Sequence, residues 1–223
     1  CSTLNHCIML TIKCFPMNML EENCYIVYDE SNEAVIIDCG EFGEHDENII
    51  DKYIESHELK VVHHLCTHMH YDHCFGVFHI WDNYGVRPEF NSADEDIYRG
   101  KNDAIFGGLR DYMYQHPLPS CNQYLKNGDI VKFGSHEFKV LATPGHTPGG
   151  VCFYCERENI VFVGDTLFQS SIGRTDFPGG SYEELCKGIK EALFTLPGDT
   201  VVYCGHGPNT SISFERNHNP YVR

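Results

Sequence analysis

Short apolar runs separated by turn residues recur along most of the chain and predict many β-strands. The run over 33–39 has consecutive apolar residues at its centre, Ala34-Val35-Ile36-Ile37, which indicates a strand buried on both faces. A turn at Pro16-Met17-Asn18 is expected to join the first two strands. The predicted strands are 9–15, 23–29, 33–39, 60–67, 129–133, 136–142, 150–155, 159–163 and 200–204.

Helical spacing of apolar residues is found in three further segments. In 44–57, Ile50 and Ile54 fall on one helix face, and the same spacing predicts helices over 72–84 and 182–194. The segment 92–120 shows no clear period and is expected to hold helical pieces and loop. Strands interleaved with helices favour a layered α/β (α+β) domain.

The chain length suits one domain. The 223 residues are 42% apolar, enough for a sizeable core, and show no repeat or linker. Because the chain begins at Cys1 and Met9 opens the first strand-like run, we expect the domain to span 9–223 and residues 1–8 to be upstream or added sequence. No apolar run approaches the roughly 20 residues that cross a bilayer, and no secretory signal pattern is present. A cytoplasmic protein is the default expectation.

The charge and the cysteine content limit which partners and which cysteine-based sites are expected. The formal charge is −16, which disfavours nucleic acid as a partner, and no membrane partner is expected. The 12 cysteines lack the spacing of a disulfide framework and are interpreted as reduced, buried apolar residues. Cys152 and Cys155 form a CxxC motif, but residues three apart on a strand face opposite sides, so no redox or metal site is expected there.

Four metal-type side chains fall within six residues of the segment Thr67-His68-Met69-His70-Tyr71-Asp72-His73. An extended backbone points His68 and His70 to the same side. Asp72 and His73 then lie where the next helix begins and can face a second point nearby. This segment can therefore serve two adjacent ions.

Three more candidate ligands share one local design, a polar group on a glycine-bounded turn directly after a strand-like run. A rigid sheet presents ligands in fixed directions at such turns. A single one of the fourteen histidines would more often be structural, but the cluster and these turns together indicate a metal site. Imidazoles and carboxylates suit zinc and also iron or manganese. The three candidates are His146 in 143–149, Asp165 in 164–166 and His206 in 205–208.

These motifs, in this order, resemble the metallo-β-lactamase superfamily over about residues 9–223. The stretches Gly-Arg-Thr-Asp-Phe-Pro-Gly-Gly at 173–180 and Phe-Glu-Arg-Asn-His-Asn-Pro at 214–220 are similar to its glyoxalase II-like branch of hydroxyacylglutathione hydrolases. The resemblance implies an αββα sandwich of two mixed sheets flanked by helices, with the site at one edge. Longer enzymes of this branch carry a C-terminal helical domain; because 17 residues follow His206, we expect that domain to be absent.

The resemblance also assigns roles to the candidate ligands. It implies two divalent ions, zinc first and iron or manganese as alternatives, with Asp72 and Asp165 as catalytic residues at the reaction centre. The predicted ligands are His68, His70 and His146 for one metal, Asp72, His73 and His206 for the other, and Asp165 as the bridge between them.

The implied activity is hydrolysis of S-lactoylglutathione or a related 2-hydroxyacyl thioester by metal-bound hydroxide. Class B β-lactamases commonly use a Cys ligand and lack the histidine that matches His73, so β-lactam hydrolysis is not expected. Arg174 is a tentative substrate contact, where it could meet a carboxylate. It could equally pair with Asp176 and brace its loop, and both alternatives stay open.

Two other functions are weighed against this one. Persulfide dioxygenases share the fold and a similar Gly-Arg-Thr-Asp-Phe loop, but use one iron held by two His and one Asp. The segment 194–199 resembles them, whereas 205–208 matches the hydrolases. A non-catalytic metal-binding partner module would need a missing ligand, and all seven are present. Lactonase or phosphodiester chemistry is also compatible with the fold, and nothing in the sequence fixes the oligomeric state.

Overall fold

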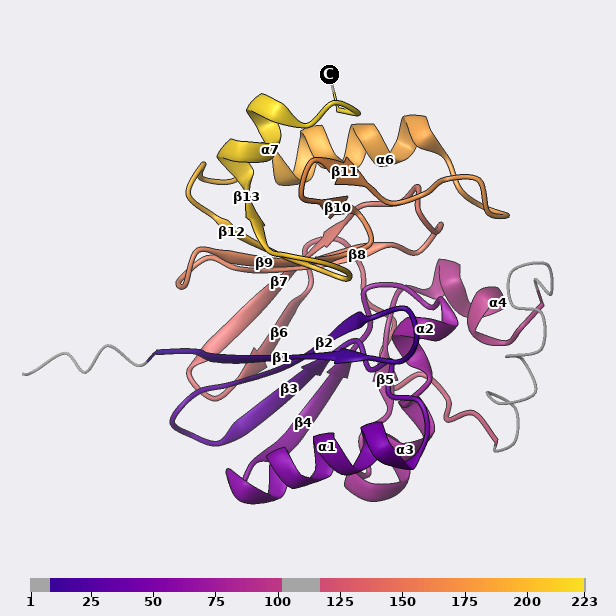
Figure 1. Cartoon of the computed structure of the whole chain (residues 1–223), viewed down its shortest axis with the longest axis vertical. Coiled ribbons are helices and arrows are strands. Elements are labelled where there is room, and N and C mark those ends of the chain that lie inside the picture. Colours follow the sequence, from indigo (N-terminus) through magenta and orange to yellow (C-terminus); the bar gives the residue numbers. More distant parts are fainter. Residues whose placement is uncertain (1–8, 102–116, 223) are drawn as a thin grey trace, which may run out of the picture.

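The computed structural model describes residues 9–101 and 117–222 and arranges most of its strands in two large mixed sheets that lie face to face (Figure 1). The expectations for residues 1–8 and for 102–116, within segment 92–120, lie outside the described residues.

The first sheet has the strand order β1-β2-β3-β4-β5. Its β1, β2 and β3 pair antiparallel, and the β3–β4 and β4–β5 pairs are parallel. Helices α1 and α3 lie on its outer side (Figure 1). The elements of this half are β1 (Thr11–Met17), β2 (Glu22–Tyr28), β3 (Glu33–Ile37), α1 (Glu44–Ser56), β4 (Lys60–Leu65), α2 (Tyr71–Cys74), α3 (Val77–Tyr84), β5 (Pro88–Glu89), η1 (Ser92–Asp94) and α4 (Glu95–Tyr98).

The second sheet has the order β13-β12-β9-β8-β7-β6, with β12 and β9 parallel and the other neighbours antiparallel. Helices α6 and α7 cover its outer side (Figure 1). The elements are β6 (Ile130–Phe133), β7 (His136–Ala142), β8 (Val151–Cys155), β9 (Ile160–Gly164), the hairpin β10 (Leu167–Phe168) and β11 (Ser171–Ile172), α6 (Tyr182–Gly188), the π-helical turn η3 (Ile189–Leu193), β12 (Val201–Cys204), β13 (Thr210–Ser211) and α7 (Ile212–His218).

Three layers of apolar side chains hold this arrangement together. The layer between the sheets contains Tyr25, Phe153 and Phe162. A second layer joins the first sheet to α1 and α3, and a third joins the second sheet to α6, η3 and α7. The αββα sandwich and the two mixed sheets that the sequence implied are therefore confirmed.

Two details of the predicted elements are wrong. The turn expected at Pro16-Met17-Asn18 begins later, because Pro16 and Met17 belong to β1. Since β1 is an edge strand, Pro16 can lack its N–H there without losing a ladder bond. The helix expected over 72–84 is divided into α2 and α3 by Gly76, whose N–H donates to the carbonyl of Cys39 instead of continuing the helix.

The two cysteines of the CxxC motif face opposite sides of β8, as the strand geometry predicted. Cys152 packs in the layer beneath α6, and Cys155 packs between the sheets. Among the described residues, no helix is both long and apolar enough to cross a membrane.

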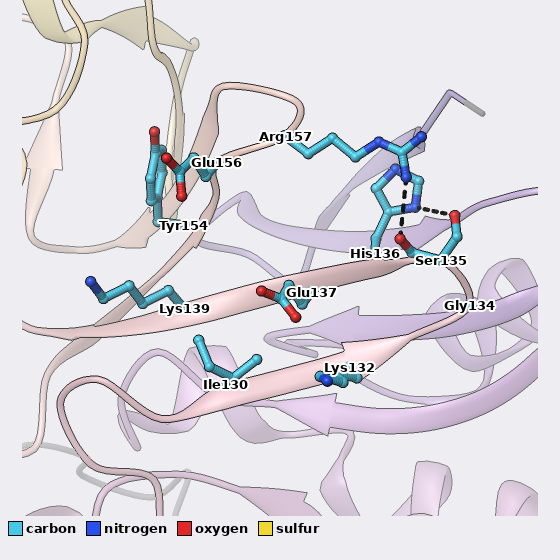
Figure 2. Close-up of a pocket in the computed structure, with 10 residues that line it drawn as sticks. All are labelled: Ile130, Lys132, Gly134, Ser135, His136, Glu137, Lys139, Tyr154, Glu156 and Arg157. Atoms are coloured by element: carbon cyan, nitrogen blue, oxygen red, sulfur yellow. Dashed lines mark hydrogen bonds between the residues drawn. The ribbon is translucent and has the colours of Figure 1, made fainter. Parts of the chain in front are cut away.

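A shallow hollow lies on the outer face of the second sheet around β6, β7 and β8 (Figure 2). Its walls carry charges of both signs, including Lys132, Lys139, Glu137 and Arg157. None of its lining residues is a predicted metal ligand, so the hollow is separate from the candidate site.

The aromatic core between the sheets gives a stability prediction. Phe162 is 1% exposed, and its ring lies 5.1 Å from Tyr25 and 4.9 Å from Tyr203. Phe162→Ala should lower the free energy of unfolding by about 3–5 kcal/mol in urea denaturation, because it leaves a cavity. Ile130→Ala, at a side chain 47% exposed, should change it by less than about 0.5 kcal/mol. Equal losses of unfolding free energy in the two variants would contradict the buried position of Phe162.

Candidate metal centre

The seven predicted ligands lie together at one edge of the sandwich, just beyond strand ends of both sheets. In the first sheet, β4 leads through 66–70 into α2, and in the second sheet the relevant turns follow β7, β9 and β12. Each turn is short and begins at a buried strand, so the sheet fixes where its side chain starts. The ligands are His68 and His70 after β4, Asp72 and His73 in α2, His146 after β7, Asp165 after β9 and His206 after β12.

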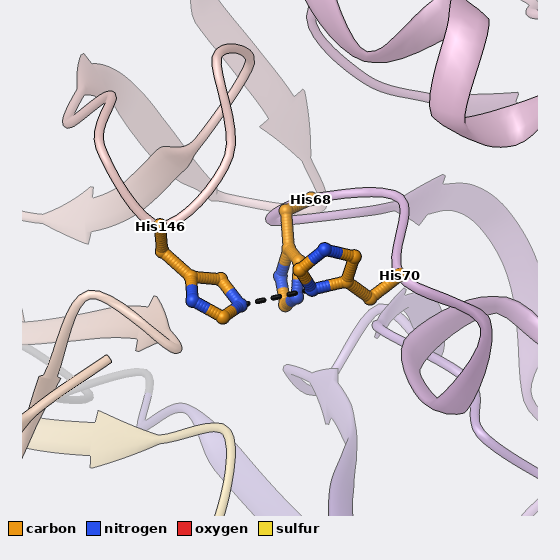
Figure 3. A group of neighbouring side chains, drawn as sticks. All are labelled: His68, His70 and His146. Atoms are coloured by element: carbon orange, nitrogen blue, oxygen red, sulfur yellow. Dashed lines mark hydrogen bonds between the residues drawn. The ribbon is translucent and has the colours of Figure 1, made fainter. Parts of the chain in front are cut away.

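The first cluster consists of His68, His70 and His146, each offering one nitrogen within 4.8 Å of the others. Figure 3 shows the three rings turned toward one another, and His70 Nδ1 lies 2.9 Å from His146 Nε2. His68 Nε2 is buried and has no hydrogen-bond partner in the described part of the chain. A buried polar atom without a partner is costly, so this nitrogen fits a metal ligand.

The second cluster consists of Asp72, His73 and His206. His206 Nε2 lies 3.2 Å from His73 Nε2 and 3.2 Å from Asp72 Oδ2. Two imidazole nitrogens and a carboxylate oxygen facing one point form a donor set that binds divalent transition metals.

Asp165 lies between the two clusters. Its Oδ2 is 3.6 Å from His146 Nε2 of the first cluster and 3.7 Å from His206 Nε2 of the second, and its Oδ1 is 3.3 Å from His73 Nε2. One carboxylate therefore reaches both clusters, which is the geometry that a bridging ligand requires.

The far nitrogen of four ligand histidines is held by a hydrogen bond. Such bonds fix the ring and leave the other nitrogen for a metal. The pairs are His68 Nδ1 with Thr67 Oγ1 at 3.1 Å, His73 Nδ1 with Asp38 Oδ2 at 3.0 Å, His146 Nδ1 with the Arg174 carbonyl at 2.8 Å, and His206 Nδ1 with the Leu20 carbonyl at 3.0 Å.

Sequence reasoning missed Asp38, which supports both clusters. Its Oδ1 accepts a bond from the Thr67 N–H at 2.7 Å, and its Oδ2 accepts from the Thr67 hydroxyl at 2.8 Å as well as from His73. Asp38 follows the buried strand β3 with a left-handed backbone, φ 51°. The signal available in the sequence was an acid directly after a buried apolar run, the same signal that pointed to Asp165.

Burial and neighbouring charges set the protonation of the ligands. Burial and His146 lower the pKa of His70 to about 3, and burial and the surrounding histidines hold the pKa of His68 well below its usual value. Burial would also lower the pKa of His73, but Asp165 and Asp72 raise it well above the usual value. His68 and His70 are therefore neutral near pH 7, as ligands must be, and a cation bound beside Asp165 would displace the proton of His73.

Arg174 lies beside the first cluster, in the loop that follows β11, and its carbonyl is the hydrogen-bond partner of His146 Nδ1. Its guanidinium donates from Nε and Nη2 to Asp176, both at 2.7 Å, and lies 3.8 Å from the ring centre of Phe177. Phe177 in turn meets the His70 ring edge-to-face at 5.5 Å. The bracing contact is thus present, and the substrate contact stays a prediction.

The His63 and His64 side chains lie away from both clusters. His63 bonds to Glu89 at 2.9 Å and to the Lys132 carbonyl at 3.1 Å, while His64 is fully buried beside Cys66. Neither contacts a predicted ligand in these bonds, in keeping with a structural role.

A family comparison places the chain among known proteins. A model of the metallo-beta-lactamase superfamily matches residues 18–206, from the first hairpin to the last predicted ligand. The chain belongs to the metallo-β-lactamase superfamily. Its members are largely metal-dependent hydrolases, and the two clusters found here are capable of binding metal ions.

Among curated members of the superfamily, hydroxyacylglutathione hydrolase GloC from Haemophilus influenzae is 34% identical over 219 residues, covering 96% of this chain and 98% of that protein. Three solved structures are similar. They are the B3 metallo-β-lactamase BLEG-1 (TM-score 0.81, 32% identity, 95% of this chain and 99% of that one), TTHA1623 in a di-iron-bound form (0.79, 32%, 94% and 99%) and ETHE1 from Myxococcus xanthus (0.77, 27%, 95% and 84%).

The shared position of Asp165 gives a prediction for metal content. Asp165→Ala should reduce the bound metal of the purified protein by at least one equivalent, since the carboxylate serves both clusters; loss of an indirect support already costs about 10–100-fold in metal affinity. Elemental analysis after dialysis measures this. His63→Ala is the control and should keep the wild-type content. Unchanged metal in Asp165→Ala would refute the bridging position.

Proposed function

We propose that the chain is a binuclear metal-dependent thioesterase that acts on S-lactoylglutathione or a related 2-hydroxyacyl thioester. The observation that carries the proposal is the complete second cluster, in which His206 meets Asp72 and His73. Similarity to the hydrolase GloC over nearly the full length of both chains supports the choice of substrate.

The seven ligands fit two divalent ions, one per cluster with Asp165 shared. Two such ions would lower the pKa of a water at the site and polarise a substrate carbonyl. Zinc suits this donor set, and the similarity to TTHA1623 in a di-iron-bound form makes iron the alternative, with manganese also compatible.

In the proposed reaction the side chains of the two clusters hold and orient the metals, and the nearby thiol of Cys74 is not the nucleophile. Cys74 follows His73 directly, but its thiol is buried and donates to the His70 carbonyl at 3.2 Å. Burial raises the pKa of this thiol well above its usual value, which disfavours a reactive thiolate. Bound metals would supply an activated water as the attacking group, and Asp72 and Asp165 would be the carboxylates that hold these metals.

Persulfide dioxygenase is the second candidate, favoured by the similarity to ETHE1 and by the Gly-Arg-Thr-Asp-Phe stretch at 173–177. That chemistry requires one iron held by two His and one Asp, so it would leave part of the present ligand set without a role. The similarity to BLEG-1 makes a β-lactam a necessary comparison substrate.

Metal count and substrate together separate these candidates. The wild-type protein should hold about two equivalents of metal and hydrolyse S-lactoylglutathione, measured by loss of thioester absorbance. His206→Ala should lose one equivalent and more than about a hundredfold in kcat/KM, since it removes a ligand. A single iron, oxygen uptake with glutathione persulfide and tolerance of His206→Ala would instead identify the dioxygenase, and turnover of a β-lactam alone would reject both.

A second prediction asks whether Arg174 binds substrate. If it meets a carboxylate of the glutathione moiety, Arg174→Ala should raise KM for S-lactoylglutathione about tenfold, the equivalent of about 1.4 kcal/mol. KM for the lactoyl thioester of a short uncharged thiol should not change. Asp176→Asn breaks the same ion pair but keeps the cation, so it should not raise KM. Equal losses on both thioesters in both variants would show that Arg174 only braces the loop.

A further inference from the structure

Asp94 is a fully buried carboxylate at the end of η1. It lies in the segment 92–120, for which the sequence showed no clear period. It accepts three hydrogen bonds. Its Oδ2 accepts from the Met69 N–H at 3.1 Å and from the Thr147 hydroxyl at 2.8 Å, and its Oδ1 accepts from the Gly149 N–H at 2.6 Å. One side chain therefore satisfies donors from two separate turns.

Two of the three donors to Asp94 are direct sequence neighbours of predicted ligands. Met69 lies between His68 and His70, and Thr147 directly follows His146. The three ligands of the first cluster are thus the sequence neighbours of the groups that bind Asp94. Met69, Thr147 and Gly149, the three donors to Asp94, are not sequence neighbours of any ligand of the second cluster.

The two turns come from different sheets, and besides Asp94 a backbone bond from the Val151 N–H to the Thr67 carbonyl, at 2.9 Å, connects the two regions. The turn with His68 and His70 leaves the first sheet after β4, and the turn with His146 leaves the second sheet after β7. Asp94 belongs to a third element, held in place because Asn91 donates to the Leu125 carbonyl at 2.8 Å and accepts from the Ala93 N–H at 3.0 Å. The approach is close: a Cβ on Gly149 would lie 2.6 Å from the Asp94 carboxyl carbon.

We propose that Asp94 is a positioning residue that fixes His68, His70 and His146 relative to one another and thereby sets the metal affinity of the first cluster alone. This inference rests on the ligand assignment of the proposed function. Its physical basis is that a carboxylate can accept all three bonds, whereas any side chain with an N–H must turn a donor toward a donor.

Asp94→Asn is the direct test because it keeps the shape and changes only the hydrogen-bonding capacity. A matched control is available in Asp29, another buried carboxylate that joins the two halves of the fold. Asp29 accepts from the N–H groups of Ser31 and Ser135 at 2.9 and 2.7 Å and from His136 Nδ1 at 2.9 Å, and none of these adjoins a predicted ligand. Asp29→Asn should destabilise the fold without selecting one cluster.

The experiment titrates cobalt into the metal-free full chain and follows its visible absorption. In Asp94→Asn, one equivalent should bind as in the wild type and the other about 10–100-fold more weakly. The spectrum at one equivalent should match that of His146→Ala, in which the first cluster is broken, and not that of His206→Ala. Asp29→Asn should keep both affinities. Wild-type affinity at both sites in Asp94→Asn, or equal weakening of both, would overturn the proposal.

A milder variant covers the case in which Asp94→Asn does not fold. Thr147→Val removes one of the three donors and should weaken binding of the same equivalent by about three- to tenfold. If neither equivalent is selectively weakened, the result counts against Asp94 as a positioning residue. If the wild-type chain binds only one cobalt, the binuclear assignment fails, and the position of Asp94 is then judged by whether that one ion is weakened in these variants.

Discussion

The geometry of the candidate metal centre depends on hydrogen bonds that tie the first sheet to the end of β12 in the second. Tyr25 packs against Phe162 between the sheets, and its hydroxyl donates to the Cys204 carbonyl at 2.6 Å. The Asn23 side chain donates to the same carbonyl at 3.0 Å, and the Asn23 N–H donates to the Gly205 carbonyl at 2.7 Å. Because these contacts immediately precede His206, the apolar core and the second cluster are aligned by the same strand, β2.

A second constraint is electrostatic. Glu22, Asp38, Asp72 and Asp165 surround the fully buried His73, in a chain whose formal charge is −16. Desolvation raises the pKa of Glu22 well above its usual value, whereas His73 holds that of Asp165 below it. So many acids away from water are tolerable only with compensating positive charge, which explains why a region of this kind favours cations.

The sequence was sufficient to predict which seven side chains could be ligands, and the structure brings these side chains together. It was insufficient to predict the groups that support them. His146, Asp165 and His206 lie on turns whose glycines and preceding apolar runs are visible in the local sequence, and His68 belongs to the dense group of His and Asp residues at 68–73. The role of Asp94 is not visible in the local sequence, because its hydrogen-bond donors lie in turns that are far from it along the chain.

The same contrast applies to the secondary structure. Strong apolar periods located α1 and most strands within one or two residues. The break between α2 and α3 depends on Gly76 bonding to Cys39, a contact that no period reveals. The short strands β5, β10, β11 and β13 have too few residues to show an alternation at all.

That both sheets contribute ligands to each cluster has a consequence for how the protein persists in a cell. An ion bound at either cluster would join the two halves, so the free energy of metal binding would become part of the free energy of folding. The folded lifetime would then follow the supply of metal. A chain without bound metal would then be less stable, and the folded fraction of the protein would fall when metal is scarce.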